Sequence, residues 1–417
     1  MRAGFGIFEI TPPLGVELAG YGYYLKRTAD RVEDPLFARA VALENNEETF
    51  LLVSCDCLGL SQEIVDQVRE RIKEKYDIPG ERMMIVSIHT HTGPAMKYHE
   101  GCGEVSPEYT AGVPEKILLA CENALNDLKE VERLEFVQQK LPQPIAYNRA
   151  CDQNPVDDQA RGFYLKRNNA PTIILASYAC HAVCQGAVKA ISADYPGRIC
   201  KKLSGEKANA MYLNGLCGDI DPIRCLPEER PARLENFANI VCEALQSQRA
   251  ALPLTVNGGQ VEESLRVVKV SEADIHHMAD TAAAHETNPP GGGKVARVWE
   301  RETLERFDQL QWEEKFPVRY LLLGGVPIIA LPFEGYTLTG MLIREALQDQ
   351  RALVLGCADQ LMGYLPTEDD IDRHSYAAQD ASFLYKRLPA QRGEAERIGR
   401  DVGKKLKEII AGGNGHD

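Results

Sequence analysis

Apolar runs of strand length alternate with helix-type segments along most of this 417-residue chain. The helix signal is clearest at 62–76, where Ile64, Val68 and Ile72 repeat every four residues and Ser61 precedes as an N-cap. Strands that alternate with helices build a sheet covered by helices. The sequence therefore predicts an α/β fold with mixed β-sheets and flanking helices. We expect one large domain at 1–410 and a flexible tail at 411–417.

The remaining elements follow from the same periodicities. The runs 37–43 and 49–55 flank a polar turn and predict a hairpin. Further strands are expected at 5–10, 83–87, 134–138, 172–179, 210–213, 254–270, 320–323, 328–331 and 352–355. Further helices are expected at 114–128, 231–245, 272–287, 295–315 and 336–347.

The glycine-rich run 288–294 separates two of these predicted helices. It does not have the spacing of a phosphate loop, because the first glycine is missing and Val295 follows Lys294 in place of Ser or Thr. A flexible connector is the better interpretation.

The formal net charge of −14 argues against nucleic acid or an anionic membrane as the partner. Several of the 12 cysteines lie inside apolar strands or helices, and no paired Cys-x-x-Cys framework is present. The N-terminus enters a strand without a hydrophobic signal core, and no apolar run is long enough to span a bilayer. We expect a reduced, cytoplasmic protein with a small-molecule substrate. The sequence leaves open whether it forms a homo-oligomer.

The segment His89-Thr90-His91 follows the apolar run 83–86. Side chains alternate along a strand, so both imidazoles are expected on the same face at the end of the strand. Such a pair suits a metal site, or one metal ligand beside an electrophilic group. The alternative is one core histidine and one solvated histidine.

Polar side chains follow several of the predicted strands where each strand ends. They are Asp56, His89, His91, His181, Asn214, Asp219, Asp221 and Glu334. In open α/β sheets the functional site lies beyond the carboxyl ends of the strands. Two or three imidazoles with one carboxylate form a zinc-type ligand set that leaves a position for water. An unligated imidazole could stabilise an oxyanion, and Asp219 or Asp221 could orient an imidazole or act as general base.

Each of these assignments has a structural alternative. Asp219 can cap the turn 218–222, and Asp56 can be a simple strand-end residue. A thiolate metal site at 180–184 is disfavoured, because the second cysteine pair is missing. The aromatic loop 20–24 either lines a ligand mouth or packs on its own domain. His276 and His277 are expected to be solvated, and no role is assigned to His99, His285 or His416.

Several motifs together resemble the neutral/alkaline (non-lysosomal) ceramidase family, in particular its N-terminal catalytic domain. The segment 89–94 matches the His-Thr-His-[Ser/Thr]-Gly-Pro motif of that family. The other similar segments, in the same order along the chain, are Asn148-Arg149, His181 with 191–197, 218–222, 331–337, 364–367 and Tyr376. The resemblance runs from the Ile10-Thr11-Pro12 start to Tyr376, and implies a neutral-ceramidase-like catalytic domain.

The resemblance implies a role for each matching residue. One zinc ion would be bound by His89, His181, Glu334 and a tyrosine, either Tyr364 or Tyr376, with Tyr364 preferred. His91 would then face the carbonyl group of the substrate.

Two departures from the family pattern bear on the substrate. Asp221 stands where the family's catalytic serine is implied, which fits a general base or a substrate ligand better than a nucleophile. The secretion signal and the C-terminal immunoglobulin-like domain usual in secreted ceramidases are not seen. We therefore expect a ceramidase-like enzyme that acts on a small polar substrate and not on ceramide.

The leading hypothesis is a zinc-dependent hydrolase in which a metal-activated water attacks an amide or related acyl bond. His91 and Arg149 would stabilise the oxyanion, and Asp221 or Asp219 would transfer protons. One alternative is a metal-dependent hydrolase or lyase that acts on a carbohydrate or polyol derivative. Another is a non-catalytic metal-binding or scaffold protein of the same fold.

Overall fold

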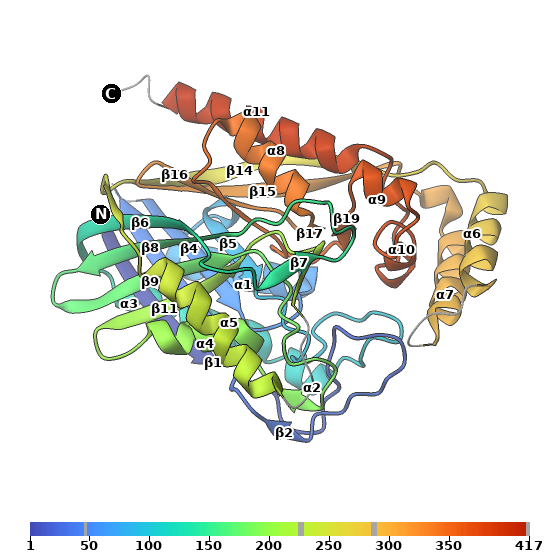
Figure 1. Cartoon of the computed structure of the whole chain (residues 1–417), viewed down its shortest axis with the longest axis horizontal. Helices are drawn as coiled ribbons and strands as arrows, with labels where there is room; N and C mark the ends of the chain where they lie inside the picture. Colours follow the sequence, from blue (N-terminus) through green and yellow to red (C-terminus); the bar gives the residue numbers. More distant parts are fainter. Residues whose placement is uncertain (46–47, 224–228, 285–289, 414–417) are drawn as a thin grey trace.

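The computed structural model describes residues 1–45, 48–223, 229–284 and 290–413 and shows four layers, helix–sheet–sheet–helix (Figure 1). The larger sheet has the order β11-β9-β8-β6-β1-β3-β4-β5, with β13 added beside β6. Its strands are β1 (Arg2–Glu9), β3 (Phe37–Asn45), β4 (Glu48–Cys55), β5 (Met83–Ser87), β6 (Lys129–Lys140), β8 (Gln159–Arg167), β9 (Ala170–Tyr178), β11 (Ala208–Asn214) and β13 (Ala250–Leu252). The smaller sheet has the order β14-β15-β16-β18, with bounds Val256–Arg266, Glu313–Leu323, Val326–Ala330 and Leu353–Leu355.

The large sheet is apolar on both faces, and the two-residue period of its strands explains how. On the β3–β4 hairpin, Ala40 and Val53 face one core, while Val41 and Leu52 face another. The second core also contains Ile328 and other residues of the small sheet, so it fills the space between the two sheets. The strands are therefore buried on both sides, as expected for a sheet covered on two faces.

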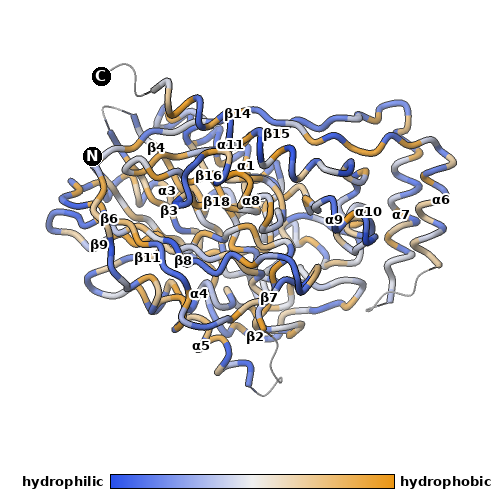
Figure 2. Tube along the Cα trace, turned by 45° about the horizontal axis from the view of Figure 1, so that its top comes forward, coloured by the Kyte–Doolittle hydropathy of each residue, from blue (hydrophilic) through white to orange (hydrophobic). Residues whose placement is uncertain are grey.

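Helices cover the two outer faces. The large sheet is covered by α1 (Gln62–Tyr76), α3 (Val113–Asn126), α4 (Asp194–Leu203) and α5 (Arg230–Leu245). The small sheet is covered by α8 (Thr337–Leu347) and α11 (Glu394–Gly413), while α6 (Glu272–Ala284) and α7 (Gly292–Glu305) form a pair at one end of the molecule (Figure 1). Figure 2 shows the orange, hydrophobic stretches running through the centre of the molecule. No helix in the described ranges combines the length and apolar character required to cross a membrane.

The expected α/β class with mixed sheets is confirmed. Antiparallel pairs such as β3–β4 occur beside parallel pairs such as β4–β5 and β9–β11. Helix α1 has the predicted bounds, and Ser61 Oγ accepts a hydrogen bond from Ile64 N at 3.3 Å.

The prediction of a helix over 295–315 is wrong in its second half. Helix α7 ends at Glu305, and β15 begins at Glu313 with Phe316 and Val318 buried on alternate positions. This two-residue period is that of a strand. Helix α7 also begins at Gly292, inside the predicted connector 288–294, of which 288–289 lie outside the described residues. Helix α11 continues to Gly413, so 411–413 of the predicted tail are helical, and 414–417 lie outside the described residues.

Candidate active site

The predicted site residues come from loops at the carboxyl ends of the strands, and two short ladders fix their positions. Strand β17 (Glu334–Gly335) pairs in parallel with β19 (Tyr364–Leu365), so Glu334 lies opposite Tyr364. Strand β12 (Ile220–Pro222) pairs antiparallel with β7 (Ala146–Asn148), which places Asp221 beside the segment that leads to Arg149. Side-chain contacts in the site then join residues far apart in the sequence, such as Arg149 with Asp221, 72 positions apart, and His89 with Glu334, 245 positions apart.

Three histidines and one glutamate converge in the interior. His89 Nε2 and His181 Nε2 each lie 3.1 Å from the same oxygen of Glu334, Oε2. His91 Nε2 lies 3.3 Å from His89 Nε2. All four residues are buried. The structure therefore brings together three of the four predicted metal ligands, with His91 beside them.

The second ring nitrogen of each converging histidine contacts a backbone carbonyl. His89 Nδ1 lies 2.8 Å from Leu58 O, and His181 Nδ1 lies 3.2 Å from Ile220 O. A carbonyl oxygen only accepts hydrogen bonds, so each Nδ1 carries a proton and Nε2 is the nitrogen that can bind a cation or a second proton. Both Nε2 atoms face the same Glu334 oxygen. Because lone pairs on nitrogen and oxygen repel one another, this arrangement requires a cation or a proton between the imidazoles and the carboxylate.

The pKa values of these residues also indicate that the cluster needs a positive charge. Burial disfavours the imidazolium of His89, but the Glu334 carboxylate outweighs burial and raises the pKa of His89 to about 9. Burial would raise the pKa of Glu334, yet the neighbouring His89 and His181 hold it well below its usual value. Burial lowers the pKa of His91 well below that of free histidine. Without a metal, a proton on His89 supplies the missing charge.

This donor set fits a divalent cation of the zinc type. Two imidazole nitrogens and a carboxylate oxygen, with their outer atoms fixed by hydrogen bonds, are the ligands that catalytic zinc takes in proteins. The geometry of His89, His181 and Glu334 is therefore compatible with such an ion.

The approach of His89 to His91 has a different cause from the predicted strand alternation. Strand β5 ends at Ser87, and His89 has a left-handed backbone with φ of 64°. His89 N donates to Cys57 O at 2.9 Å, and His91 N donates to Ala182 O at 3.3 Å. Neighbouring loops therefore hold this strained turn and aim both rings inward.

Three tyrosines surround Glu334, and one of them was not predicted. Tyr364 OH accepts a hydrogen bond from Arg149 Nη2 at 2.8 Å, and burial, with the nearby Glu334 carboxylate, raises the pKa of Tyr364 well above its usual value. Tyr385 OH donates a hydrogen bond to Glu334 Oε1. Tyr376 lies behind Tyr364, with ring centroids 6.0 Å apart. No periodicity or motif in the sequence marks Tyr385.

Arg149 and Asp221 lie at the more exposed side of the site. Arg149 Nη2 lies 3.5 Å from His181 Nε2 and donates to Gly218 O at 2.9 Å, while Arg149 Nη1 approaches Asp221 Oδ1 at 3.4 Å. The side chains of Arg149 and Asp221 are 29% and 15% exposed, whereas that of Glu334 is 2% exposed. A charged pair thus borders the buried histidine cluster.

Asp219 has the contacts of a structural residue. Its carboxylate accepts hydrogen bonds from Asn148 Nδ2 at 2.6 Å, from Thr337 N at 2.9 Å and from Thr337 Oγ1 at 3.1 Å. Thr337 begins helix α8 three residues after Glu334, so Asp219 anchors the loop that carries Glu334. Burial raises the pKa of Asp219 to about 6.

Substitution Asp219→Ala is expected to lower the free energy of unfolding by about 1–3 kcal/mol, because it leaves the buried Thr337 N–H without an acceptor. Chemical denaturation measures this change. The matched control is Asp280→Ala on α6, where the side chain is 65% exposed and the change should stay within about 0.5 kcal/mol. Equal stabilities of the two variants would contradict the anchoring role.

The remaining candidates lie elsewhere. Asp56 binds Arg39 Nη1 at 2.8 Å and Phe37 N at 2.9 Å, so it is a buried strand-end residue. His276 pairs with Glu300 on the surface, as expected for a solvated histidine. His99 is buried against the ring of Tyr385, with centroids 4.6 Å apart, a contact that the sequence did not indicate.

The aromatic loop 20–24 packs on His91. The ring centroids of Tyr21 and His91 are 5.2 Å apart, Arg27 lies over the Tyr21 ring at 4.7 Å, and Arg27 Nη2 donates to His91 O at 2.9 Å. Gly20 has φ of 98°, and a Cβ there would lie 2.5 Å from His91 Cγ. Only glycine therefore lets this loop approach His91.

Because His91 is predicted to face the substrate, substitution Gly20→Ala is expected to displace its ring and to lower kcat by about 10²-fold, the effect that small misplacements of a catalytic group have. Metal content should be unchanged, since His91 is not in the proposed ligand set. Gly15→Ala is the matched control, because Gly15 has φ of 96° and no atom within 4 Å of the added Cβ. A Gly20→Ala enzyme as active as the Gly15→Ala enzyme would show that the position of His91 does not matter.

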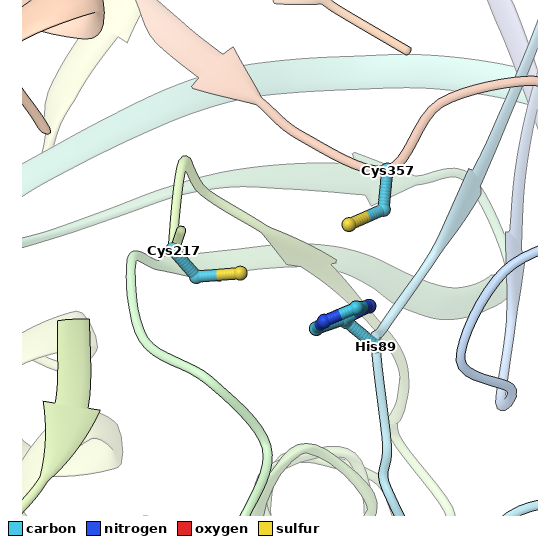
Figure 3. A group of neighbouring side chains, drawn as sticks. All are labelled: His89, Cys217 and Cys357. Carbon is cyan, nitrogen blue, oxygen red and sulfur yellow. The ribbon is translucent and has the colours of Figure 1, made fainter. Parts of the chain in front are cut away.

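Two thiols form a further group beside His89 (Figure 3). Cys217 follows β11 and Cys357 follows β18, both are fully buried, and the candidate ligand atoms of His89 and the two cysteines lie within 4.8 Å of one another. A hydrogen bond from Cys357 lowers the pKa of the Cys217 thiol to about 6. Cys357 lies just after the end of a strand, as the predicted site residues do, and this position is the signal that could have identified it.

Comparison with known proteins rests on structure. A scan of the sequence against protein-family models gave no match, and a search of curated proteins gave none either. The structure is similar to that of the neutral ceramidase from Pseudomonas aeruginosa, with a TM-score of 0.74 and 16% identity over 98% of this chain and 74% of the ceramidase chain. It is also similar to a ceramidase solved in complex with C2, with a TM-score of 0.75 and 15% identity over 98% and 75% of the two chains. The expected resemblance is confirmed at the level of structure: this chain has a neutral-ceramidase-like fold.

Proposed function

We propose that the protein is a metal-dependent hydrolase that cleaves an amide or related acyl bond in a small polar molecule. The observation that carries this proposal is the convergence of His89 Nε2 and His181 Nε2 on one oxygen of Glu334, each at 3.1 Å. The fold shared with two ceramidases supports it. We further propose that the protein acts in the cytoplasm, without nucleic acid or membrane as partner.

His89, His181 and Glu334 would hold one zinc ion, with Tyr364 as the fourth protein ligand. When bound, such an ion acts as a Lewis acid and lowers the pKa of a coordinated water to about 7. Tyr385 keeps Glu334 in place through its hydrogen bond to Oε1 and so leaves Oε2 facing the two histidines. Tyr364 is preferred to the alternative tyrosine, Tyr376, because the ladder β17–β19 pairs Tyr364 directly with Glu334.

In this proposal His91 and Arg149 stabilise negative charge on a substrate oxygen. Burial lowers the pKa of His91 well below its usual range and so favours the neutral ring, and its Nδ1 has no hydrogen-bond partner among the residues that the structure describes. Arg149 donates to Tyr364 and keeps its guanidinium beside His181. Donors fixed before the reaction cost little reorganisation when charge develops, which is the main source of such stabilisation.

Asp221 is the proposed general base. Its Oδ1 lies 3.8 Å from His181 Nδ1 and 3.4 Å from Arg149 Nη1, at the exposed border of the site. A carboxylate at this border can take a proton from an incoming water and pass it to the leaving amine. Asp219 supports this segment structurally and does not transfer protons in this proposal.

The border of the site favours a small polar substrate. The side chains of Arg149 and Asp221 are partly exposed here and Tyr376 is exposed, and the charged pair Arg149–Asp221 presents both donors and acceptors of hydrogen bonds. A long acyl chain would find no apolar partner in this pair, whereas a hydroxyl, amide or carboxylate would.

A substrate screen with the zinc-loaded protein tests the proposal. N-acyl amino acids and N-acyl amino sugars should be hydrolysed, and the same protein stripped with a chelator should be inactive until zinc is restored. Turnover of glycosides or polyol derivatives without any amide cleavage would favour a metal-dependent hydrolase or lyase of carbohydrates. A zinc-loaded protein inert toward all these classes would favour a scaffold and contradict the proposal.

A further inference from the structure

Cys217 and Cys357 have no part in the proposed hydrolysis, yet their loops are built into the metal-binding region. Gly356 N donates to Asn214 O at 3.2 Å and joins the two cysteine loops. Cys357 N donates to Phe333 O at 3.0 Å, next to Glu334, and Ser87 N donates to Cys357 O at 3.1 Å, near His89. Backbone bonds thus fix the thiols relative to the proposed ligands.

The thiols and His89 have the separations of a ligand set. Their candidate ligand atoms all lie within 4.8 Å of one another. A tetrahedral Zn²⁺ ion, with zinc–sulfur distances of about 2.3 Å and zinc–nitrogen distances of about 2.1 Å, would require separations of roughly 3.5–3.8 Å. Figure 3 shows the sulfur atoms of Cys217 and Cys357 directed into the space next to the His89 ring. A small inward movement of the side chains would complete the set.

Charge also favours a divalent cation here. Two thiolates and a neutral imidazole together balance a charge of two, so this ligand set leaves no net charge on the bound cation itself. Sulfur ligands are soft and select thiophilic metals over hard ones, in contrast to the set of His89, His181 and Glu334. Neighbouring groups support the thiols, since Asn214 Nδ2 lies 3.4 Å from Cys217 Sγ.

His89 can serve only one of the two sets at a time. Its Nδ1 is occupied by Leu58 O, so Nε2 is its one free ligand atom. We propose that Cys217, Cys357 and His89 Nε2 form a second position for a soft divalent cation such as Cd²⁺, and that occupation of this position excludes the histidine–glutamate site. The binding claim goes beyond the proposed hydrolysis and does not depend on it.

Titration of the metal-free, full-length protein with Cd²⁺ tests this claim. The wild-type protein should develop the ultraviolet thiolate-to-cadmium charge-transfer absorption with one equivalent of Cd²⁺. The variants Cys217→Ser and Cys357→Ser should lose most of it. The control Cys121→Ser changes a buried cysteine on α3, outside this group, and should keep it. His181→Ala should also keep it, because His181 belongs only to the other set.

Two results of this titration would overturn the proposal. The first is a wild-type protein, folded by circular dichroism, that shows no thiolate absorption at saturating Cd²⁺. The second is absorption of equal strength in the two serine variants.

¹¹³Cd NMR of the wild-type protein is a further measurement, and it does not depend on whether a variant folds. A chemical shift typical of mixed sulfur and nitrogen ligands is expected. A shift typical of oxygen and nitrogen ligands alone would contradict the site. Zinc-loaded protein should exchange zinc for Cd²⁺ with a total of one ion, and two ions bound together would contradict exclusion.

Discussion

The variant His89→Ala is expected to retain less than about a tenth of the bound zinc and to lose at least about 10³-fold in kcat/KM. The loss of zinc follows because His89 Nε2 faces Glu334 at the centre of the donor set. The fall in rate follows because a metal contributes several kcal/mol of stabilisation to the transition state, and each 1.4 kcal/mol corresponds to a factor of ten. Elemental analysis and steady-state kinetics on the same preparation measure both effects.

The control for this variant is His276→Ala, which removes an exposed histidine paired with Glu300. It should keep full zinc content and activity. His181→Ala should behave like His89→Ala in both measurements, because the two imidazoles contact the same carboxylate oxygen. Full zinc content in either His89→Ala or His181→Ala would show that the ligand assignment is wrong.

The variant Asp221→Asn is expected to lower kcat by about 10²–10⁴-fold, the range typical for loss of a general base, with unchanged zinc content. The amide keeps the shape of the side chain and its acceptor oxygen toward Arg149 but cannot take a proton. The measurement is kcat with an N-acyl substrate, combined with zinc analysis. Normal kcat in Asp221→Asn would place the base elsewhere.

Asp221→Ser separates the two roles that this position can have. Serine restores the hydroxyl that the ceramidase resemblance implies here, but it removes the carboxylate. We expect the serine variant to be as impaired as the asparagine variant. Activity near that of the wild type would show that a hydroxyl suffices, and would contradict the general-base role of Asp221.

Local signals explain what could be predicted from the sequence. Helix α1 carries a four-residue repeat and a serine cap, and β5 is a short apolar run that ends at a turn, so both were found with their bounds. The rule that strand ends meet at one edge placed His89, His181 and Glu334 in a larger group of polar residues, and the ceramidase resemblance selected them as ligands. The structure places these three residues in contact.

Other elements were missed because tertiary contacts override their local pattern. Strand β8 contains Arg161 and Arg167, which are buried only because they pair with Asp157 and Asp127. These charged residues interrupt the continuous apolar pattern that predicts a strand buried on both faces. Helix α4 begins at Asp194 in a left-handed conformation and contains a proline and a glycine in its first turn, which obscures the start signal.

The missed parts of the site have the same origin. Tyr385 reaches Glu334 from the segment after the short helix α10 (Asp380–Leu384), and nothing local in the sequence connects the two residues. The position of His91 depends on Gly20, which is distant in sequence and matters through a single close approach. Contacts of this kind become visible only in three dimensions.

The most direct test of the account is the position of the metal in crystals of the zinc-loaded protein. Anomalous diffraction collected at the zinc absorption edge should show one peak about 2.0–2.2 Å from His89 Nε2, His181 Nε2 and an oxygen of Glu334. Absence of a peak at this position in fully loaded protein, or a peak that does not contact His181 and Glu334, would contradict the proposed metal centre and the hydrolysis that depends on it.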